Sequence, residues 1–514
     1  MTKLRRVLVI AGSDCSGGAG LEADQRVLAA HRCYALTATT ALTAQNTLGV
    51  QDIHVVPTEF VRKQISAGLE DVGADVVKIG MLASKNTVLM VSNALRHHQV
   101  PVIVLDPVMV STSGSQLLPS EAVSSVRTSL LPITTVLTPN IPEGLLLLRD
   151  SGIGVLDPEN LDDAITLAEQ LHKLGPKYIL LKGGHLPLTA ARKKPKLLEE
   201  ASIVVDILYD GTSVHLIETE YSRSRNTHGT GCSLASAIAA NLAENMEVLR
   251  AVREACRFVE AGIKTSIDVG QGHGPINHFH SLYSLPFSPG HFLDYVLERP
   301  DVRPLWESFT KHEFVNRLAD ATLPLNSFRD YLIQDYLYLV HFARSNALAA
   351  YKNQTMEGIS ASAKIVLHIE REMALHLDYC ASFGLSKEDI EFHKESQACT
   401  AYSRYILDVG QSEDWLALQV ALSPCLIGYG AIAQRLHSDE GSVRTDNKYW
   451  KWVENYVAED YSAAVRLGSE LLETHMRNVS RFRVEELVRI FKRATELEIG
   501  FWDMGLQGQH CVEG

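Results

Sequence analysis

The spacing of hydrophobic positions changes about halfway along the chain. Up to about residue 270, short runs rich in Val, Ile and Leu alternate with longer stretches whose apolar residues lie three and four apart. The short runs predict buried strands, and the longer stretches predict helices that cover them. Strands are expected at 7–11, 76–79, 102–105, 135–137, 178–181 and ending near 219, and helices at 57–70, 85–98, 233–243 and 248–267. This alternation predicts an α/β domain with a mostly parallel sheet and helices on both faces.

From residue 304 onward the pattern becomes helical and stays helical. Helices are expected at 324–350, 361–383, 395–409, 415–436 and 484–498. They predict an all-α bundle whose functional side chains point inward. Residues 270–275, Gly-Gln-Gly-His-Gly-Pro, stop the preceding helix, and 277–297 show no clear period. We therefore expect two domains, 1–280 and 299–514, joined by a linker at 281–298, each able to fold alone.

Composition and charge narrow the class of protein. A length of 514 residues predicts two or more domains, and the formal net charge of −13 argues against nucleic-acid binding. No apolar run approaches the ~20 residues needed to span a membrane, and no signal peptide is expected. The eight cysteines are scattered without a Cys-x-x-Cys pair, which argues against a disulfide framework or a zinc site. A reducing, cytoplasmic location is expected.

The most informative motif is residues 226–232, Asn-Thr-His-Gly-Thr-Gly-Cys. Gly229 and Gly231 allow a tight turn, and Thr230 lies between them. The N–H groups of Gly231 and Cys232 then lie at a helix N-terminus, where an anion such as a phosphoryl group is favoured. The alternative interpretation is a glycine-rich turn that merely starts a helix.

Further polar residues follow the expected strands, at the sheet edge where α/β proteins bind ligands. Asp106 follows the strand at 102–105, and Asn140 and Glu143 follow the strand at 135–137. Both carboxylates are suitable oxygen ligands for magnesium, although Glu143 could be an ordinary first-turn glutamate. Lys182 ends another strand beside two glycines, where it could neutralise a phosphate.

Two other segments could form a substrate pocket. A glycine cluster at 11–20 follows the first strand, although a plain turn has the same composition. In the segment 41–47, the carboxamide of Gln45 carries a donor and an acceptor, which complement the ring nitrogen and exocyclic amine of an aminopyrimidine. Gln45 could instead be a surface residue, and Met81 could be plain core.

Together these motifs resemble the hydroxymethylpyrimidine kinase branch of the ribokinase-like superfamily. In that branch a Cys replaces the general-base Asp of the anion hole, and Cys232 stands at this place. The resemblance implies that Cys232 either takes the proton of the substrate hydroxyl, if the helix N-terminus lowers its pKa, or packs against the pyrimidine. It also implies magnesium at Asp106 and Glu143. The implied pyrimidine site is Gly12, Ala19, Gln45, Met81 and Val108, and the implied ATP site is Asn140, Lys182, Gly229, Thr230 and Gly231.

The second half has its own motifs. Asp335 and Tyr338, three residues apart, share one helical face among aromatic neighbours, so a buried partner is implied for the carboxylate. Cys425 and Tyr429 are neighbours in Leu-Ser-Pro-Cys-Leu-Ile-Gly-Tyr, although Cys is also a common core residue. Glu498 begins a Glu-x-x-Phe-Trp ending.

These motifs resemble the TenA family of thiaminase II enzymes over nearly the whole half. The resemblance implies that Cys425 is a nucleophile, Glu498 its acid and base, and Asp335 the anchor of a pyrimidine. It implies pocket walls formed by Tyr338, Tyr402, Tyr429 and Tyr456.

The two resemblances together imply a fusion of two thiamin-pathway enzymes, similar to fungal trifunctional thiamin-biosynthesis proteins. The first half would use ATP and Mg²⁺ to phosphorylate hydroxymethylpyrimidine and then its monophosphate. The second half would release hydroxymethylpyrimidine from thiamin or aminomethylpyrimidine. The alternative is a pyridoxal-type vitamin kinase fused to a helical module that only binds pyrimidine or oligomerises. Small pyrimidines are the expected partners, without nucleic acid or membrane, and a homo-oligomer (dimer or tetramer) is expected.

Overall fold

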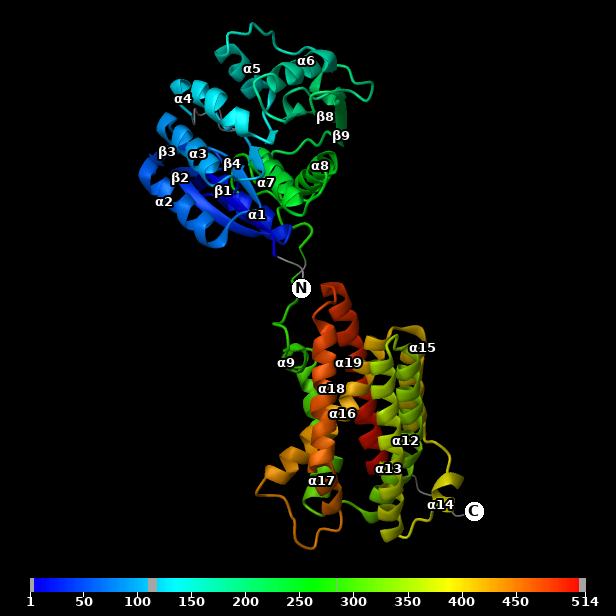
Figure 1. Cartoon of the computed structure of the whole chain (residues 1–514). Coiled ribbons are helices and arrows are strands. Elements are labelled where there is room, and N and C mark those ends of the chain that lie inside the picture. Colours follow the sequence, from blue (N-terminus) through cyan, green and yellow to red (C-terminus); the bar gives the residue numbers. More distant parts are fainter. Residues whose placement is uncertain (1–3, 110–117, 283, 508–514) are drawn as a thin grey trace. The chain divides into compact units, whose positions relative to one another are not determined.

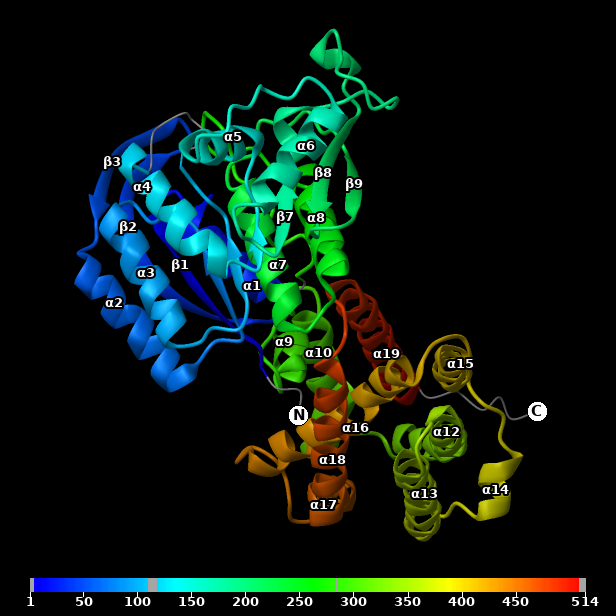
Figure 2. The same cartoon turned by 45° about the horizontal axis from the view of Figure 1, so that its top comes forward.

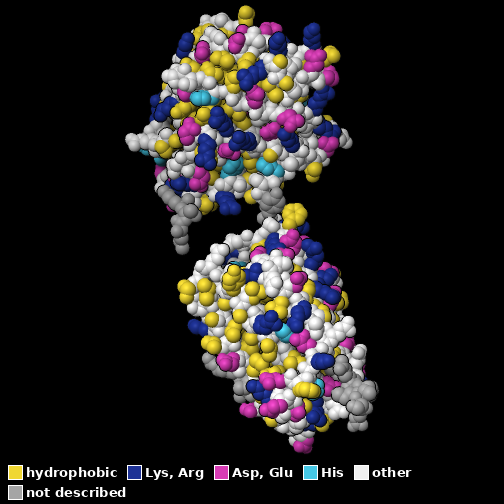
Figure 3. All heavy atoms as spheres, turned by 90° about the vertical axis from the view of Figure 1, so that its right-hand side faces the viewer, with side chains coloured by type: hydrophobic (Ala, Val, Ile, Leu, Met, Phe, Trp, Pro, Cys, Tyr) yellow, Lys and Arg dark blue, Asp and Glu magenta, His cyan; other side chains and the backbone are white. Residues whose placement is uncertain are grey.

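The computed structural model describes residues 4–109, 118–282 and 284–507. The chain divides into two compact units, Met1–Leu282 and Tyr283–Gly514 (Figure 1). On the face shown in Figure 3, acidic and basic side chains are interspersed over both units. Each unit is described here by itself.

The first unit is built on a nine-stranded sheet in the order β3-β2-β1-β4-β5-β6-β7-β8-β9. The pairs from β2 through β1 to β7 are parallel, whereas β3, β8 and β9 pair antiparallel at the two edges. The strands are β1 (Arg6–Asp14), β2 (Tyr34–Asn46), β3 (Gly49–Val55), β4 (Val76–Ile79), β5 (Ile103–Leu105), β6 (Val136–Leu137), β7 (Tyr178–Leu181), β8 (Ile203–Tyr209) and β9 (Val214–Glu220).

Helices cover both faces of this sheet, as the alternating pattern predicts (Figure 2). In β1, Leu8 and Ile10 pack under α2, α3, α5 and α6, whereas Val7 and Val9 pack under α1, α7 and α8. Burial on both sides explains why the strand is a continuous apolar run. The helices are α1 (Gly20–Ala30), α2 (Thr58–Ala67), α3 (Lys85–His97), α4 (Ser120–Ser125), α5 (Ile141–Asp150), α6 (Leu161–His172), α7 (Thr230–Ala243) and α8 (Val248–Lys264), with short turns η1 (Gly68–Val72), η2 (Val126–Leu130), η3 (Leu131–Ile133), η4 (Gly183–His185) and η5 (Leu198–Glu200).

The second unit is helical throughout its described residues, as predicted. Its long helices α12, α13, α15, α16 and α19 lie in the bundle, and its largest core is rich in aromatic side chains. The helices are α9 (Phe292–Glu298), α10 (Arg303–Thr310), α11 (Glu313–Ala319), α12 (Leu325–Lys352), α13 (Met356–Ser382), α14 (Lys387–Phe392), α15 (Gln397–Ser412), α16 (Trp415–Ser438), α17 (Trp450–Val457), α18 (Glu459–Met476) and α19 (Arg481–Gln507).

Helix α9 lies inside the segment 281–298, which was expected to be a linker. Phe292 and Val296 are fully buried in a core with residues of α16 and α19. The carboxylate of Glu473 accepts the N–H groups of Phe292 and Leu293 at 2.9 and 2.8 Å, and so caps a helix start that has no side-chain cap of its own. The second unit therefore begins before residue 299. Two buried positions in seven residues gave too weak a period to indicate this helix.

Helix α16 is long and apolar enough to cross a membrane by length and composition. In its most apolar window, 72% of the residues are buried inside the second unit. The expectation that no apolar stretch reaches this length was therefore wrong for α16. A helix buried on most sides in a protein core has the same apolar composition, and α16 contributes residues to both cores of the second unit.

Candidate active sites

A cavity of about 730 Å³ lies at the C-terminal ends of the parallel strands of the first unit. Its lining comes from the ends of strands β1, β2 and β4 to β7 and the segments that follow them, from β8, β9 and α8, and from the turn that starts α7. Such edges collect ligand-binding residues because each strand ends there in a loop free to approach a ligand. The cavity brings together every first-half residue expected in a site: Gly12, Ala19, Gln45, Met81, Asp106, Val108, Asn140, Glu143, Lys182, Gly229, Thr230, Gly231 and Cys232.

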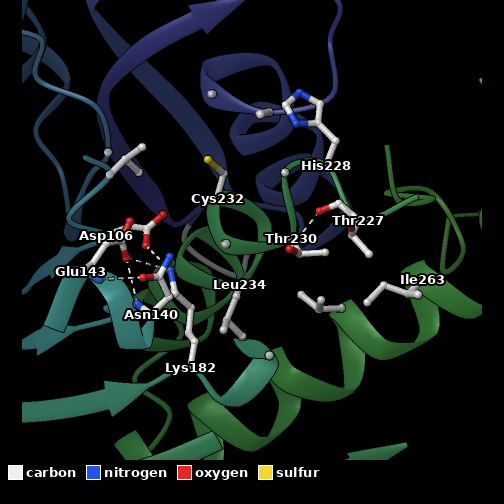
Figure 4. Close-up of a pocket in the computed structure, with 18 of the residues that line it drawn as sticks. Asp106, Asn140, Glu143, Lys182, Thr227, His228, Thr230, Cys232, Leu234 and Ile263 are labelled. Carbon is white, nitrogen blue, oxygen red and sulfur yellow. Dashed lines mark hydrogen bonds and ion pairs between the residues drawn. The ribbon is translucent and has the colours of Figure 1, made fainter. Parts of the chain in front are cut away.

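One side of the cavity holds a compact charged cluster (Figure 4). The Lys182 Nζ lies 2.7 Å from Asp106 Oδ1 and 3.9 Å from Glu143 Oε2. Glu143 is held by a capping box in which its carboxylate accepts the Asn140 N–H at 2.8 Å, while Asn140 Oδ1 accepts the Glu143 N–H at 2.8 Å. The β6–α5 turn thus presents both residues to the cavity.

Burial and charge set the protonation of this cluster. Burial, with the nearby charge of Asp106, raises the pKa of Glu143 to about 7, although Lys182 opposes the rise. Burial alone would lower the pKa of Lys182, but the Asp106 and Glu143 carboxylates outweigh it and raise that pKa. Lys182 is therefore a permanent cation beside two carboxyl groups.

The turn before α7 approaches the β1–α1 loop very closely. Gly229 has φ +79°, and a Cβ there would lie 1.9 Å from the carbonyl oxygen of Gly18. A Cβ on Gly231 would lie 3.2 Å from Lys182 Nζ. Because no side chain caps α7, the N–H groups of its first turn are open to an anionic ligand.

The segment 270–278 supports this turn from outside the cavity. Residues 270–278 run between the β2–β3 turn and the turn before α7. The N–H groups of Gly272 and His273 donate to Thr47 at 3.1 and 2.9 Å, and the N–H of His228 donates to the Gly274 carbonyl at 3.1 Å. Ser233 Oγ, on α7, lies 3.0 Å from Nε2 of His278 in this segment. This segment is part of the site's frame.

The second unit gathers its own buried polar groups. Tyr402 Oη donates to Glu498 Oε1 at 2.8 Å, and the ring of Tyr402 stacks on Tyr338 at 4.8 Å and 17°. The Cys425 thiol on α16 lies close enough to Glu498 and Asp335 for both of their charges to act on it. These residues come from α12, α15, α16 and α19, so four helices converge on one point.

Burial controls the acidities in this group. It raises the pKa of Glu498 to about 8, helped by the charge of Asp335 and opposed by the Tyr402 hydrogen bond. It also raises the pKa of the Cys425 thiol well above its usual value, with the charges of Glu498 and Asp335 adding to the effect. Asp335 itself is 5% exposed. The Tyr429 ring lies 5.2 Å from Tyr456.

Comparison with known proteins matches both units. A family model described as phosphomethylpyrimidine kinase matches residues 14–277, and one described as TENA/THI-4/PQQC family matches residues 299–508. The chain belongs to the phosphomethylpyrimidine kinase family. Both predicted resemblances are confirmed.

Relatives of the chain span both of its units. Hydroxymethylpyrimidine/phosphomethylpyrimidine kinase 2 of Schizosaccharomyces pombe is 42% identical, over 96% of this chain and 90% of its own length. Hydroxymethylpyrimidine/phosphomethylpyrimidine kinase THI20 of Saccharomyces cerevisiae is 34% identical, over 98% and 96%. Among solved structures, an ADP complex of Bacillus subtilis pyridoxal kinase is 31% identical and covers 54% of this chain and 98% of its own, with a TM-score of 0.47. Phosphomethylpyrimidine kinase of Clostridium difficile is 34% identical and covers 50% and 97%, with a TM-score of 0.41.

The pKa of the Cys232 thiol differs from the one expected at a helix N-terminus. The helix N-terminus was expected to lower the pKa of its thiol. Burial instead raises that pKa to about 11, and the positive charge of Lys78 only partly offsets the rise. The desolvation of a buried thiolate outweighs the helix dipole here.

Sequence reasoning missed several buried polar residues of the family member's kinase unit. Lys78 in β4 and Asp24 in α1 are both fully buried, and Lys78 Nζ lies 2.9 Å from each Asp24 carboxylate oxygen. Ser236 Oγ donates to Asp24 Oδ1 at 2.7 Å, one helical turn after Cys232. A Lys within the apolar run Val-Val-Lys-Ile was the available signal, because buried charges are almost always paired. Asp14 and His228 form a second buried pair.

Proposed function

We propose that the first unit transfers the γ-phosphoryl group of ATP to hydroxymethylpyrimidine and then to its monophosphate. The observation that carries this proposal is the Asp106–Lys182–Glu143 cluster facing the uncapped first turn of α7 across one cavity. Phosphoryl transfer requires mostly positioning and charge neutralisation, and these groups supply both. The names of the relatives support the same substrates.

The chain's own residues divide this work. Lys182 neutralises charge on the phosphates, and the N–H groups of Gly231 and Cys232 hold the transferring group at the start of α7. The neutral Cys232 thiol favours the packing role over the general-base role, because little proton removal is needed in a loose transition state. Asp106 and Glu143 fit a hydrated magnesium ion, which commonly takes one or two carboxylates together with substrate phosphates. When bound, magnesium would add positive charge beside the phosphates.

The second unit would form hydroxymethylpyrimidine by covalent catalysis. Cys425 Sγ adds to a ring carbon of the pyrimidine as its proton passes to the Glu498 carboxylate, which protonates a ring nitrogen. The ring then expels the thiazole of thiamin, or ammonia from aminomethylpyrimidine. Water adds in its place, and the Cys425 thiol is released with its proton restored. Asp335 would anchor the pyrimidine, with Tyr338, Tyr402, Tyr429 and Tyr456 as walls.

One experiment tests the combined function in the full chain. Aminomethylpyrimidine and MgATP should yield the pyrimidine diphosphate, because hydrolysis creates the hydroxyl that the kinase needs. Cys425→Ser should stop this flux, yet leave phosphorylation of added hydroxymethylpyrimidine unchanged. Cys380→Ser, at a different cysteine of the same unit, is the control. No diphosphate from either pyrimidine, or a preference for pyridoxal, would overturn the proposal. The homo-oligomer and the cytoplasmic location remain predictions of the sequence.

A further inference from the structure

One histidine nitrogen in the kinase cavity serves two partners. His228 Nε2 lies 2.8 Å from Asp14 Oδ2 and 3.1 Å from Gln45 Nε2. His228 is 8% exposed and Asp14 is 3% exposed. Gly18 packs against the ring so closely that an added Cβ would lie 2.4 Å from its Cδ2, and the backbone N–H of His228 donates to the Gly274 carbonyl.

The surroundings of Asp14 decide where the histidine proton lies. Asp14 Oδ1 accepts the N–H and hydroxyl of Ser16 at 2.9 and 2.7 Å, and Oδ2 accepts the Ala19 N–H at 2.9 Å. Burial acts to raise the pKa of Asp14, but hydrogen bonds from His228 and Ser16 outweigh it and lower that pKa. Asp14 is therefore an ionised acceptor, and the group facing it must donate. His228 Nε2 thus carries a hydrogen whether the ring is neutral or charged.

This hydrogen settles the orientation of the Gln45 amide. If the NH₂ group faced Nε2–H, two hydrogen-bond donors would meet. The amide oxygen must therefore face His228. In the structure Gln45 Oε1 lies 3.2 Å from Thr43 Oγ1 and Nε2 faces His228, and a half-turn of the amide exchanges the two groups, which brings the NH₂ group to Thr43 Oγ1. Thr43 can accept that N–H while its own hydroxyl donates to the Ser13 carbonyl at 3.0 Å. In this arrangement each contact of the chain pairs a donor with an acceptor.

We infer that His228 is a specificity-determining positioning residue, which locks the Gln45 carboxamide so that the kinase accepts 4-aminopyrimidines and rejects 4-oxo analogues. The inference rests on the proposed function of the first unit. The locked amide presents its acceptor on the His228 side and its donor on the Thr43 side. An aminopyrimidine offers an amine donor beside a ring-nitrogen acceptor, and its 4-oxo analogue offers the reverse pair. A freely rotating amide would suit both.

The test is the ratio of kcat/KM for hydroxymethylpyrimidine to that for its 4-oxo analogue. His228→Phe keeps an aromatic ring but removes the donor, so we expect the ratio to fall about tenfold or more, mainly through faster turnover of the oxo analogue. His228→Gln, which can again donate to Asp14, should restore part of the ratio. An unchanged ratio in His228→Phe overturns the inference. Failure of the unsubstituted enzyme to phosphorylate hydroxymethylpyrimidine would instead overturn the proposed function.

A measurement on the unsubstituted chain keeps the inference testable if His228→Phe does not fold. The ¹⁵N resonance of His228 Nε2, assigned by its loss in His228→Gln, should show a bonded proton. A bare Nε2 would overturn the lock, because the amide could then turn its NH₂ group to the ring. Hydrolase activity of the same samples measures the amount of folded second unit, and so normalises the kinase rates.

Discussion

At the scale of single residues, Lys78 is a charge within an apolar strand and is fully buried against Asp24. Lys78→Met leaves Asp24 without its counter-ion, which typically costs about 3–5 kcal/mol. We expect the melting temperature of the first unit to fall by roughly 10 °C, measured by calorimetry. Lys63→Met, on the exposed side of α2, is the matched control. Equal melting of the two variants would contradict the prediction.

Glu498 gives the hydrolase a pH dependence of defined sign. Below a pKa of about 8 it is protonated, and the neutral Cys425 thiol then has no base to receive its proton. The hydrolase kcat/KM should therefore rise with pH up to about 8, about tenfold per unit on the acid side, and level off above it. Glu498→Gln, which has no titrating carboxyl at this position, is the control and should lose the rise. A hydrolase rate that is flat between pH 6 and 8 would exclude Glu498 as this base.

Site residues were predictable where a motif carries them along the chain. Lys182 follows a strand beside glycines, and the structure places it against Asp106 from another strand. The partners Asp14, Asp24 and Lys78 were missed, because pairing across 54 residues or more leaves no local pattern. The roles assigned to the site residues remain predictions.

At the scale of elements, the turn into α7 depends on a glycine. Gly229→Ala would add a Cβ 1.9 Å from the Gly18 carbonyl oxygen in a left-handed conformation, so the turn must move. Displacing its N–H groups should lower the kinase kcat by about 10²–10³, with hydrolysis unchanged. Gly154→Ala is the control, since nothing lies within 4 Å of its added Cβ and its φ is not left-handed. Kinase activity near normal in Gly229→Ala would remove the turn from the mechanism.

Element prediction succeeded for several periodically buried elements but not for β2, which was not expected. Strands buried on both faces, such as β4, and long amphipathic helices, such as α8, were predicted within a few residues. The edge strand β3 was missed, because it is largely exposed and alternates weakly. Helix α9 was missed for its short length, and its stability comes from tertiary contacts with Glu473 and the core.

At the scale of the whole molecule, the position of a cut between the units matters. The fragment 283–514 retains α9, whereas 299–514 lacks the buried Phe292 and Val296. Loss of a fully buried Phe alone costs about 3–5 kcal/mol. We expect the shorter fragment to melt roughly 10 °C lower, with 1–282 active as a kinase by itself. Equal melting temperatures of the two helical fragments would show that α9 contributes little to the second unit.

The segment 270–278 limits where another domain can be fused to the kinase unit. It is hydrogen-bonded to Thr47, His228 and Ser233, so the end of the first unit supports the turn that borders the kinase cavity. A foreign domain attached after residue 282 leaves the whole first unit in place, whereas one attached before residue 270 removes these hydrogen bonds to the turn before α7. A fusion point on the N-terminal side of this segment would therefore disturb the kinase unit, whereas one on its C-terminal side would not. The residues that lead to the second unit therefore belong structurally to the kinase unit that precedes them.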